Sequence, residues 1–375
     1  MPAIRPFVID IPEETLIDLN DRLEWTRWPD RELVADWTQG IPLSYVKDFC
    51  EYWQHTYDWR ETENRLNALD NYLITIDNVD IHCIVQKSTH EESLPLLITH
   101  GWPGSVVEFL HAIPLLRKRQ SDDDLAFHVI VPSLPGFGFS SKPTATGWGV
   151  DKIANAWVEL MGTLGYDKFL VQGGDWGAAV SSSIAANHPD HCLGLHTNMP
   201  TVGPLRETLD DLTPQEEEAL RGSRFYQDWD SGYSKQQSTR PQTLGYGLVD
   251  SPAAQAAWIL EKFYQWTDCN GHPENAITRD ELIDNIMLYW LTGSGASSAR
   301  IYWESFGRGS RKDINVPSGC SIFPKEIFKP SRRWVEAVYK DLRYYNVLEK
   351  GGHFAAFENP EVFVSELKAC FAQMS

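Results

Sequence analysis

Positive charge, long apolar runs and paired cysteines are all scarce in this sequence. Its 375 residues include 33 Lys and Arg against 52 Asp and Glu, which gives a formal net charge of −19. Nucleic acids and anionic membrane surfaces repel so acidic a chain, so we expect neither as a partner. No apolar stretch approaches the roughly 18 uninterrupted residues of a membrane span, and residues 1–10 lack the apolar core of a signal peptide. These absences predict a soluble, cytoplasmic protein without a membrane anchor.

The cysteines and the common cofactor motifs give no sign of a bound group. The six cysteines are scattered without a C-x-x-C pair, which in a chain of this length indicates reduced thiols in a cytosol. There is no H-E-x-x-H metal motif and no Walker loop. The one glycine-rich candidate, Gly293-x-Gly295-x-x-Ser298, lacks its final glycine and follows a predicted helix. We therefore expect no metal, nucleotide or other cofactor.

The stretch around Asp175 gives the strongest chemical signal. An apolar strand over residues 169–172 leads into the motif G-G-D-W-G at residues 173–177, and small residues then favour a helix. This is the strand-turn-helix pattern of the nucleophile elbow, G-x-S-x-G, with aspartate in the serine position. A carboxylate there can attack an alkylating carbon and form a covalent ester. The same residues also fit a glycine turn in which Asp175 caps the helix, and the motif alone leaves both interpretations open.

The order of predicted strands and helices indicates an α/β protein. From Tyr72 the pattern changes from helix to strand, and short strands then alternate with helices, which is typical of a mostly parallel, doubly wound sheet with right-handed crossovers. Strand patterns nearly vanish over residues 203–311, where aromatic-rich helices predict a cap that roofs an apolar pocket. We assign the core to residues 76–202 and 312–375, and residues 1–75 to an N-terminal helical extension.

His353 is the candidate base for a nucleophile at Asp175. It follows two glycines in a loop before the last predicted helix, a frame that none of the other histidines shares. The candidate for the acid that orients it is Glu326, just after a predicted strand end, and Asp313 is the alternative. The order nucleophile, acid, histidine along the chain is that of the α/β-hydrolases. A loop histidine is often structural, so the assignment depends on its meeting Asp175.

Backbone N–H groups for an oxyanion hole are expected at two positions. One is Trp176, directly after the candidate nucleophile. The other is Trp102, in the H-G-W-P-G-S loop that follows a predicted strand over residues 94–99. The carboxyl ends of the strands share one edge of an open α/β sheet, so the two tryptophans are expected to meet there.

Together these motifs resemble the epoxide hydrolases of the α/β-hydrolase superfamily, in the microsomal-type branch. The similarity covers nearly the whole chain and includes the H-G-W-P-G-S loop, the G-G-D-W-G elbow and the G-G-H-F-A-A-F-E stretch around His353. The N-terminal part resembles the N-terminal domain of that branch, but we expect no anchor of the kind that membrane-bound members have. The matching N-terminal residues are Arg5-Pro6-Phe7, Leu23, Thr26-Arg27-Trp28-Pro29-Asp30, Tyr57-Asp58-Trp59-Arg60 and Ile81-His82.

The resemblance implies roles for individual residues. The family's nucleophile, acid and base fall, in that order, on Asp175, Glu326 and His353. Its two cap tyrosines, which bind the epoxide oxygen, fall on Tyr233 and Tyr302. Tyr302 has aromatic neighbours in the sequence, so Tyr289 is kept as an alternative. The implied substrates are a small apolar epoxide and water, the product is a vicinal diol, and no cofactor is required.

Two other functions fit parts of the pattern. A haloalkane dehalogenase shares the aspartate and the tryptophan after it, but would need halide donors in place of the tyrosine pair. A receptor without activity can have the same fold, but usually lacks a member of the triad. The residues leave open the natural epoxide, the stereochemistry and the biological role, which includes intramolecular opening to a cyclic ether. They also leave open the oligomeric state, for which a homodimer is one option.

Overall fold

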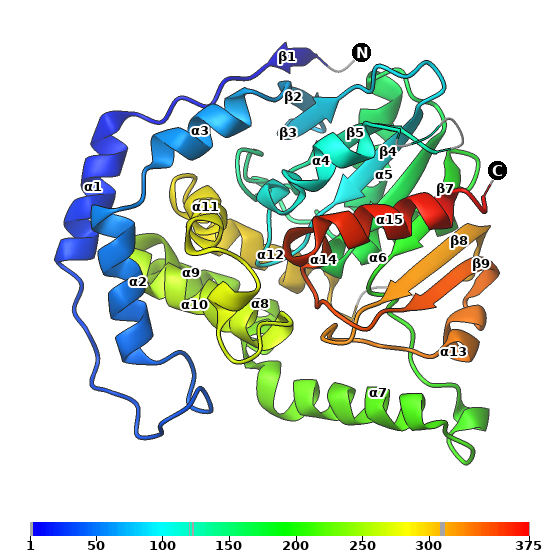
Figure 1. The fold of residues 1–375 in the computed structure, drawn as a ribbon. Helices are drawn as coiled ribbons and strands as arrows, with labels where there is room; N and C mark the ends of the chain where they lie inside the picture. Colours follow the sequence, from blue (N-terminus) through cyan, green and yellow to red (C-terminus); the bar gives the residue numbers. More distant parts are fainter. Residues whose placement is uncertain (1–2, 120, 122–123, 308–311, 375) are drawn as a thin grey trace.

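A nine-stranded sheet runs through the computed structural model, which describes residues 3–119, 121, 124–307 and 312–374 (Figure 1). The order of the strands is β1-β2-β3-β5-β4-β6-β7-β8-β9. The strands are β1 (Ile4–Pro6), β2 (Asn71–Ile76), β3 (Val79–Gln86), β4 (Leu94–Thr99), β5 (Phe127–Pro132), β6 (Phe169–Gly173), β7 (Cys192–Thr197), β8 (Ile314–Ile322) and β9 (Tyr339–Val347).

Most neighbouring strands of this sheet are parallel. β5, β4, β6, β7, β8 and β9 form one parallel run, whereas the pairs β1–β2, β2–β3 and β3–β5 are antiparallel. β6 is buried at every residue, as expected for an apolar strand covered on both faces. The chain passes from β4 to β5 on one side and returns to β6 on the other. In open sheets the binding site lies at such a switch point, beyond the carboxyl ends of the strands.

Helices cover both faces of the sheet (Figure 1). α5 (Val150–Thr163) packs beside α6 (Asp175–Asn187), and α15 (Pro360–Phe371) packs beside the short α4 (Ala112–Leu116). α6 also lies against β6, β7 and β8, so the helix that starts at the predicted elbow is fixed directly to the sheet. The short elements of this part are the 3-10 turn η1 (Val106–Phe109), α13 (Arg332–Glu336) and α14 (Ala355–Glu358).

Between β7 and β8 the chain forms a helical segment, at the place where the sequence predicts a cap. It contacts the loops after β4 and β6, through Tyr233 against Trp102 and Tyr302 against Trp176. The division into domains stays a prediction, and the predicted end of the cap at residue 311 lies outside the described residues. The elements are η2 (Arg206–Thr208), α7 (Pro214–Phe225), the π-helical turn η3 (Tyr226–Asp230), α8 (Gly232–Thr239), α9 (Pro241–Asp250), α10 (Pro252–Trp266), η4 (Pro273–Asn275), α11 (Arg279–Trp290) and α12 (Gly295–Ser305).

The N-terminal part combines helices with strands at the edge of the sheet. Its helices are α1 (Glu13–Glu24), α2 (Leu43–His55) and α3 (Trp59–Asn67), and β2 spans the predicted boundary at residue 75. β1 is too short to leave an alternating pattern, so the sequence gives no sign of it. Among the described residues, none of the helices has the length and apolar character that crossing a membrane requires.

Candidate active site

Asp175 lies at a sharp turn between β6 and α6. Its φ angle is +49°, in the left-handed region that residues other than glycine rarely adopt. Close packing requires the glycines around it: a Cβ on Gly177 would stand 1.8 Å from the carbonyl oxygen of Thr99. The N-cap of α6 is Gly174, and no side chain caps this helix. The interpretation of Asp175 as a helix cap is therefore wrong, and the turn has the geometry of the predicted elbow.

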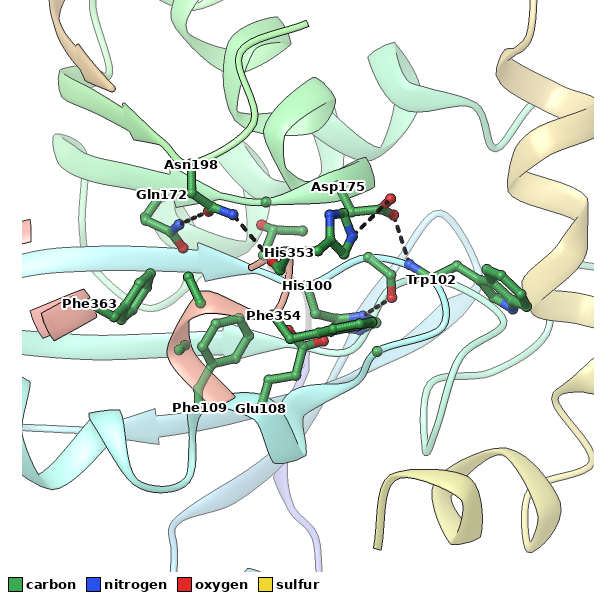
Figure 2. A pocket seen from close by; sticks show the side chains of 16 residues that line it. His100, Trp102, Glu108, Phe109, Gln172, Asp175, Asn198, His353, Phe354 and Phe363 are labelled. Carbon is green, nitrogen blue, oxygen red and sulfur yellow. Dashed lines mark hydrogen bonds and ion pairs between the residues drawn. The ribbon is translucent and has the colours of Figure 1, made fainter. Parts of the chain in front are cut away.

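Side chains from three distant parts of the chain meet at this turn. The Nε2 atom of His353 lies 3.5 Å from Oδ2 of Asp175, and its Nδ1 atom lies 2.6 Å from Oε1 of Glu326 (Figure 2 shows the contact with Asp175). The side chains of His353 and Glu326 are almost fully buried. The nucleophile, base and acid predicted from the sequence thus form one continuous series of contacts.

Glu326 follows the end of β8, whereas the alternative acid, Asp313, precedes its beginning. The two carboxyl groups therefore lie at opposite ends of this strand. The Asp313 carboxylate lies 3.6 Å from the ammonium of Lys340 in a largely exposed pair. Glu326 is fixed in the site by the amide of Asn198, which lies 3.3 Å from its Oε2 atom. The geometry favours Glu326 as the partner of the histidine.

The charge on His353 depends on its two carboxylate neighbours. Burial by itself would lower the pKa of the imidazole, but Glu326 and Asp175 outweigh it and hold the pKa of His353 well above its ordinary value. The imidazole is therefore protonated near neutral pH in the unliganded protein. Loss of either negative charge would lower this pKa and make the imidazole a better proton acceptor.

The backbone N–H of Trp102 donates a hydrogen bond to Oδ1 of Asp175 at 2.8 Å. This contact brings the H-G-W-P-G-S loop and the elbow together, as predicted. The N–H of Trp176 lies in the first turn of α6, where backbone donors have no helical acceptor. The use of both N–H groups as oxyanion donors stays a prediction.

The two predicted tyrosines, Tyr233 on α8 and Tyr302 on α12, lie side by side over the site. Their ring centroids are 5.8 Å apart, and both rings pack on Trp102. The Tyr302 hydroxyl is buried without a hydrogen-bond partner among the described residues, while the Tyr233 hydroxyl lies 3.0 Å from that of Tyr226. The hydroxyl of Tyr289 instead donates to the backbone carbonyl of Gly104 at 2.6 Å, in the H-G-W-P-G-S loop, which is called the Trp102 loop below. The unsatisfied hydroxyl favours Tyr302 over Tyr289 as the second tyrosine.

Comparison with known proteins connects this geometry to a family. Residues 4–109 match the family model described as epoxide hydrolase N terminus, and residues 95–242 match the alpha/beta hydrolase fold. A putative epoxide hydrolase of Stigmatella aurantiaca is 51% identical over 99% of this chain and 86% of its own length. Epoxide hydrolase 1 of Oryctolagus cuniculus is 36% identical over 97% and 88%, respectively. The chain belongs to the epoxide hydrolases.

Solved structures of other epoxide hydrolases share the whole fold. The juvenile hormone epoxide hydrolase of Bombyx mori has a TM-score of 0.93 at 32% identity, with 100% of this chain and 95% of that chain covered. An epoxide hydrolase of Aspergillus niger has a TM-score of 0.91 at 32% identity, with 100% and 97% covered. These likenesses confirm the predicted α/β-hydrolase fold and the predicted assignment to the epoxide hydrolases, a family of enzymes.

Several residues behind the site of this epoxide hydrolase were not predicted from the sequence. The carbonyl of Trp266 accepts the backbone N–H of His353 at 2.9 Å, and the two rings pack 5.0 Å apart. The indole of Trp266 donates to the buried Asp230 at 2.6 Å. The ammonium of Lys262 lies 2.7 Å from the same carboxylate and 4.7 Å from the ring centroid of Tyr233. Nothing in the local sequence distinguishes these residues from the core of an ordinary helical segment.

A small cavity of about 20 Å³ lies between the elbow and the histidine loop (Figure 2). Asp175, His353, Glu108 and Asn198 are among the residues that line it. A cavity of that size holds about one water molecule. Glu108, on η1 just after the Trp102 loop, was not predicted as a site residue, because nothing local separates it from a charged residue on a solvated turn.

Proposed function

We propose that this epoxide hydrolase opens a small apolar epoxide with water to a vicinal diol, through a covalent ester on Asp175. The observation that carries the proposal is the surroundings of the Asp175 carboxylate. One oxygen accepts the Trp102 N–H and the other faces His353, while the tyrosine pair packs on the Trp102 ring nearby. A nucleophile close to two O–H donors suits an epoxide, because its oxygen takes up negative charge as the ring opens.

In the first step an Asp175 oxygen bonds to a ring carbon while the carbon–oxygen bond of that carbon breaks. The electron pair of the broken bond goes to the epoxide oxygen, which takes a proton from Tyr233 or Tyr302. Burial raises the pKa of both phenols well above its ordinary value, so both are neutral donors at the start. No base is needed, since a carboxylate is already a nucleophile. The products are a hydroxyalkyl ester and a tyrosinate.

In the second step His353 becomes the base. Esterification removes the charge of Asp175, one of the two carboxylates that hold the proton on the imidazole. The pKa of His353 therefore falls, and the imidazolium proton restores the phenol. The neutral imidazole, held by Glu326, then takes a proton from water, and the hydroxide adds to the carbonyl carbon of the ester.

The tetrahedral intermediate carries a negative oxygen, which the N–H groups of Trp102 and Trp176 stabilise. Its collapse breaks the bond to the alkyl oxygen, which takes the proton of the newly added hydroxyl and leaves as the diol. Asp175 is again a carboxylate and His353 again an imidazolium, so the site returns to its starting state. Epoxide and water are consumed in equal amounts, and no cofactor enters the balance.

The aromatic surroundings of the carboxylate favour an apolar substrate. The rings of Trp102, Trp176 and Phe306 all pack on Tyr302 within 6.0 Å between centroids. A haloalkane dehalogenase would not need the unsatisfied Tyr302 hydroxyl, which is the group that separates the two functions here.

Turnover of styrene oxide and of a bromoalkane tests the proposal. We expect the diol from styrene oxide and no release of bromide from the bromoalkane. The Asp175→Ala variant should form neither the ester nor the diol, while its melting temperature stays unchanged. Bromide release without diol would instead identify a dehalogenase. Substantial diol formation by a folded Asp175→Ala variant would remove the covalent mechanism.

A further inference from the structure

Glu108 is a buried acid that the proposed steps leave unused. It lies on η1, is 8% exposed, and lines the small cavity together with Asp175 and His353. In Figure 2 its side chain extends into the space below His353 and Phe354. Burying a carboxyl group costs several kcal/mol unless strong partners compensate. A methionine or leucine of similar size would be more stable at a purely structural position, so the presence of an acid requires a reason.

The backbone of the Trp102 loop makes room for this carboxyl group. A Cβ on Gly104 would stand 1.6 Å from Oε1 of Glu108, so the carboxyl occupies the space that a side chain at position 104 would take. The loop is in turn fixed by the cap, because Asn285 donates to the Pro103 carbonyl at 2.8 Å and Tyr289 to the Gly104 carbonyl at 2.6 Å. Glu108 is thus held against the loop that carries the Trp102 donor.

The carboxyl group of Glu108 interacts electrostatically with both Asp175 and His353 across the cavity that the three side chains line. The pKa of Glu108 is raised to about 8, mainly by burial and also by Asp175, while His353 acts to lower it. The N–H of Ser105 also acts to lower it. Whether ionised or neutral, a carboxyl group keeps an oxygen that can accept a hydrogen bond. Glu108 therefore offers an acceptor to the cavity that His353 also lines, at any pH at which the enzyme is folded.

We propose that Glu108 positions the water that hydrolyses the Asp175 ester, an inference that rests on the proposed covalent mechanism. The attacking water has two protons. Nε2 of His353 takes one of them. The second stays on the hydroxide and forms a hydrogen bond to an oxygen of the Glu108 carboxyl group. A buried O–H left without an acceptor costs about 1–3 kcal/mol. Glu108 removes that cost and fixes the water oxygen, whose lone pair is then directed at the ester carbon. The water-sized cavity between the three side chains is the space that this molecule needs.

Separate measurement of the two steps tests the inference. Single-turnover quenching with styrene oxide gives the rate of ester formation on Asp175 and the rate of its loss. In Glu108→Leu we expect ester formation within about twofold of the original rate, and hydrolysis slower by about 10- to 100-fold. Glu108→Gln retains an acceptor oxygen and should lose much less. Equal slowing of both steps, or hydrolysis at the original rate in folded Glu108→Leu, would overturn the assignment.

Rescue by a small acid separates positioning from general support of the fold. Glu108→Ala leaves a space in which added formate can accept the same hydrogen bond, so formate should speed hydrolysis of the ester and leave its formation unchanged. If Glu108→Leu does not fold, this variant carries the test, and absence of rescue in folded Glu108→Ala contradicts the inference. Glu366→Gln is the matched control, because Glu366 is a buried acid that bonds Ser321 and Tyr344 outside the cavity.

His353→Gln distinguishes failure of this inference from failure of the mechanism. That variant should accumulate one substrate adduct on the peptide that contains Asp175, because ester formation needs no base. An adduct there, together with unaffected hydrolysis in the Glu108 variants, would contradict only the role of Glu108. Failure to form an adduct on Asp175 in any variant would contradict the proposed function itself.

Discussion

At the scale of single residues, the site depends on the coupling between the charges of Asp175 and His353. The two atoms Oδ2 and Nε2 are 3.5 Å apart in a buried setting, where an ion pair interacts more strongly than in water. In the proposed mechanism this carboxylate is the nucleophile, and its charge also helps to raise the pKa of the imidazole. In that mechanism the conversion of the carboxylate to an ester changes the role of the histidine between the two steps.

Asp175→Asn imitates that loss of charge without a substrate. We expect a lower pKa for His353 in this variant than in the unmodified enzyme, because the attraction of one carboxylate is gone and burial and Glu326 remain. The imidazolium should then persist to a higher pH in the unmodified enzyme. Nuclear magnetic resonance of the labelled imidazole against pH measures both values. Equal pKa values would show that Asp175 does not control the histidine.

At the scale of elements, α8 and α12 bring the two tyrosines together from separate helices. The turn before α8 is a π-helical one, Tyr226–Asp230, and its last residue is tied to Lys262 of α10 at 2.7 Å. Turns of this kind are common at functional sites. The cap thus fixes Tyr233 by its own backbone and by a neighbouring helix, while Tyr302 is placed by the packing of α12 on α8 and α9.

Removal of the two hydroxyls should have effects that depend on each other. Tyr233→Phe and Tyr302→Phe should each keep measurable ester formation, because one phenol still donates to the epoxide oxygen. The double variant should lose about 100- to 1,000-fold or more, the scale of losing an oxyanion donor. Single-turnover kinetics measures each loss, with Tyr246→Phe, an exposed tyrosine of α9, as the control. A silent Tyr302→Phe beside a crippled Tyr289→Phe would reassign the second tyrosine.

Asp284 of α11 joins the cap to the N-terminal helices. It is 1% exposed, accepts the hydroxyls of Tyr57 and Thr62, and pairs with Arg65. Asp284→Ala leaves these groups without their acceptor, so we expect a loss of about 2–3 kcal/mol in the free energy of unfolding. Denaturation by urea measures it.

Asp284→Asn keeps an acceptor oxygen and should cost less than the alanine variant. The exposed pair between Arg332 and Glu336 supplies the control, because Glu336→Ala should change the stability by no more than about 0.5 kcal/mol. A cost of Asp284→Ala as small as that of the control would show that the contact does not stabilise the fold.

At the scale of the whole molecule, the features that could be predicted from the sequence are those with a local sequence motif. The elbow, the Trp102 loop and the loop of His353 have local motifs, so the sheet and the meeting of Asp175, His353 and Glu326 could be predicted. Trp266 contacts His353 and Glu108 lines the cavity beside Asp175, each far from these residues in the sequence, and no local pattern distinguishes them. The second tyrosine stayed open between two residues, because a helix rich in aromatic residues does not reveal which ring faces the site.

A single turnover in water labelled with oxygen-18 tests the covalent mechanism most directly. With enzyme in excess over styrene oxide, the ester breaks at its carbonyl carbon, so the second oxygen of the first diol comes from Asp175 and not from water. We predict an unlabelled diol and a gain of oxygen-18 on the peptide that contains Asp175, both read by mass spectrometry. Labelled diol in the first turnover, with an unlabelled Asp175 peptide, would show direct attack of water on the epoxide and contradict the ester.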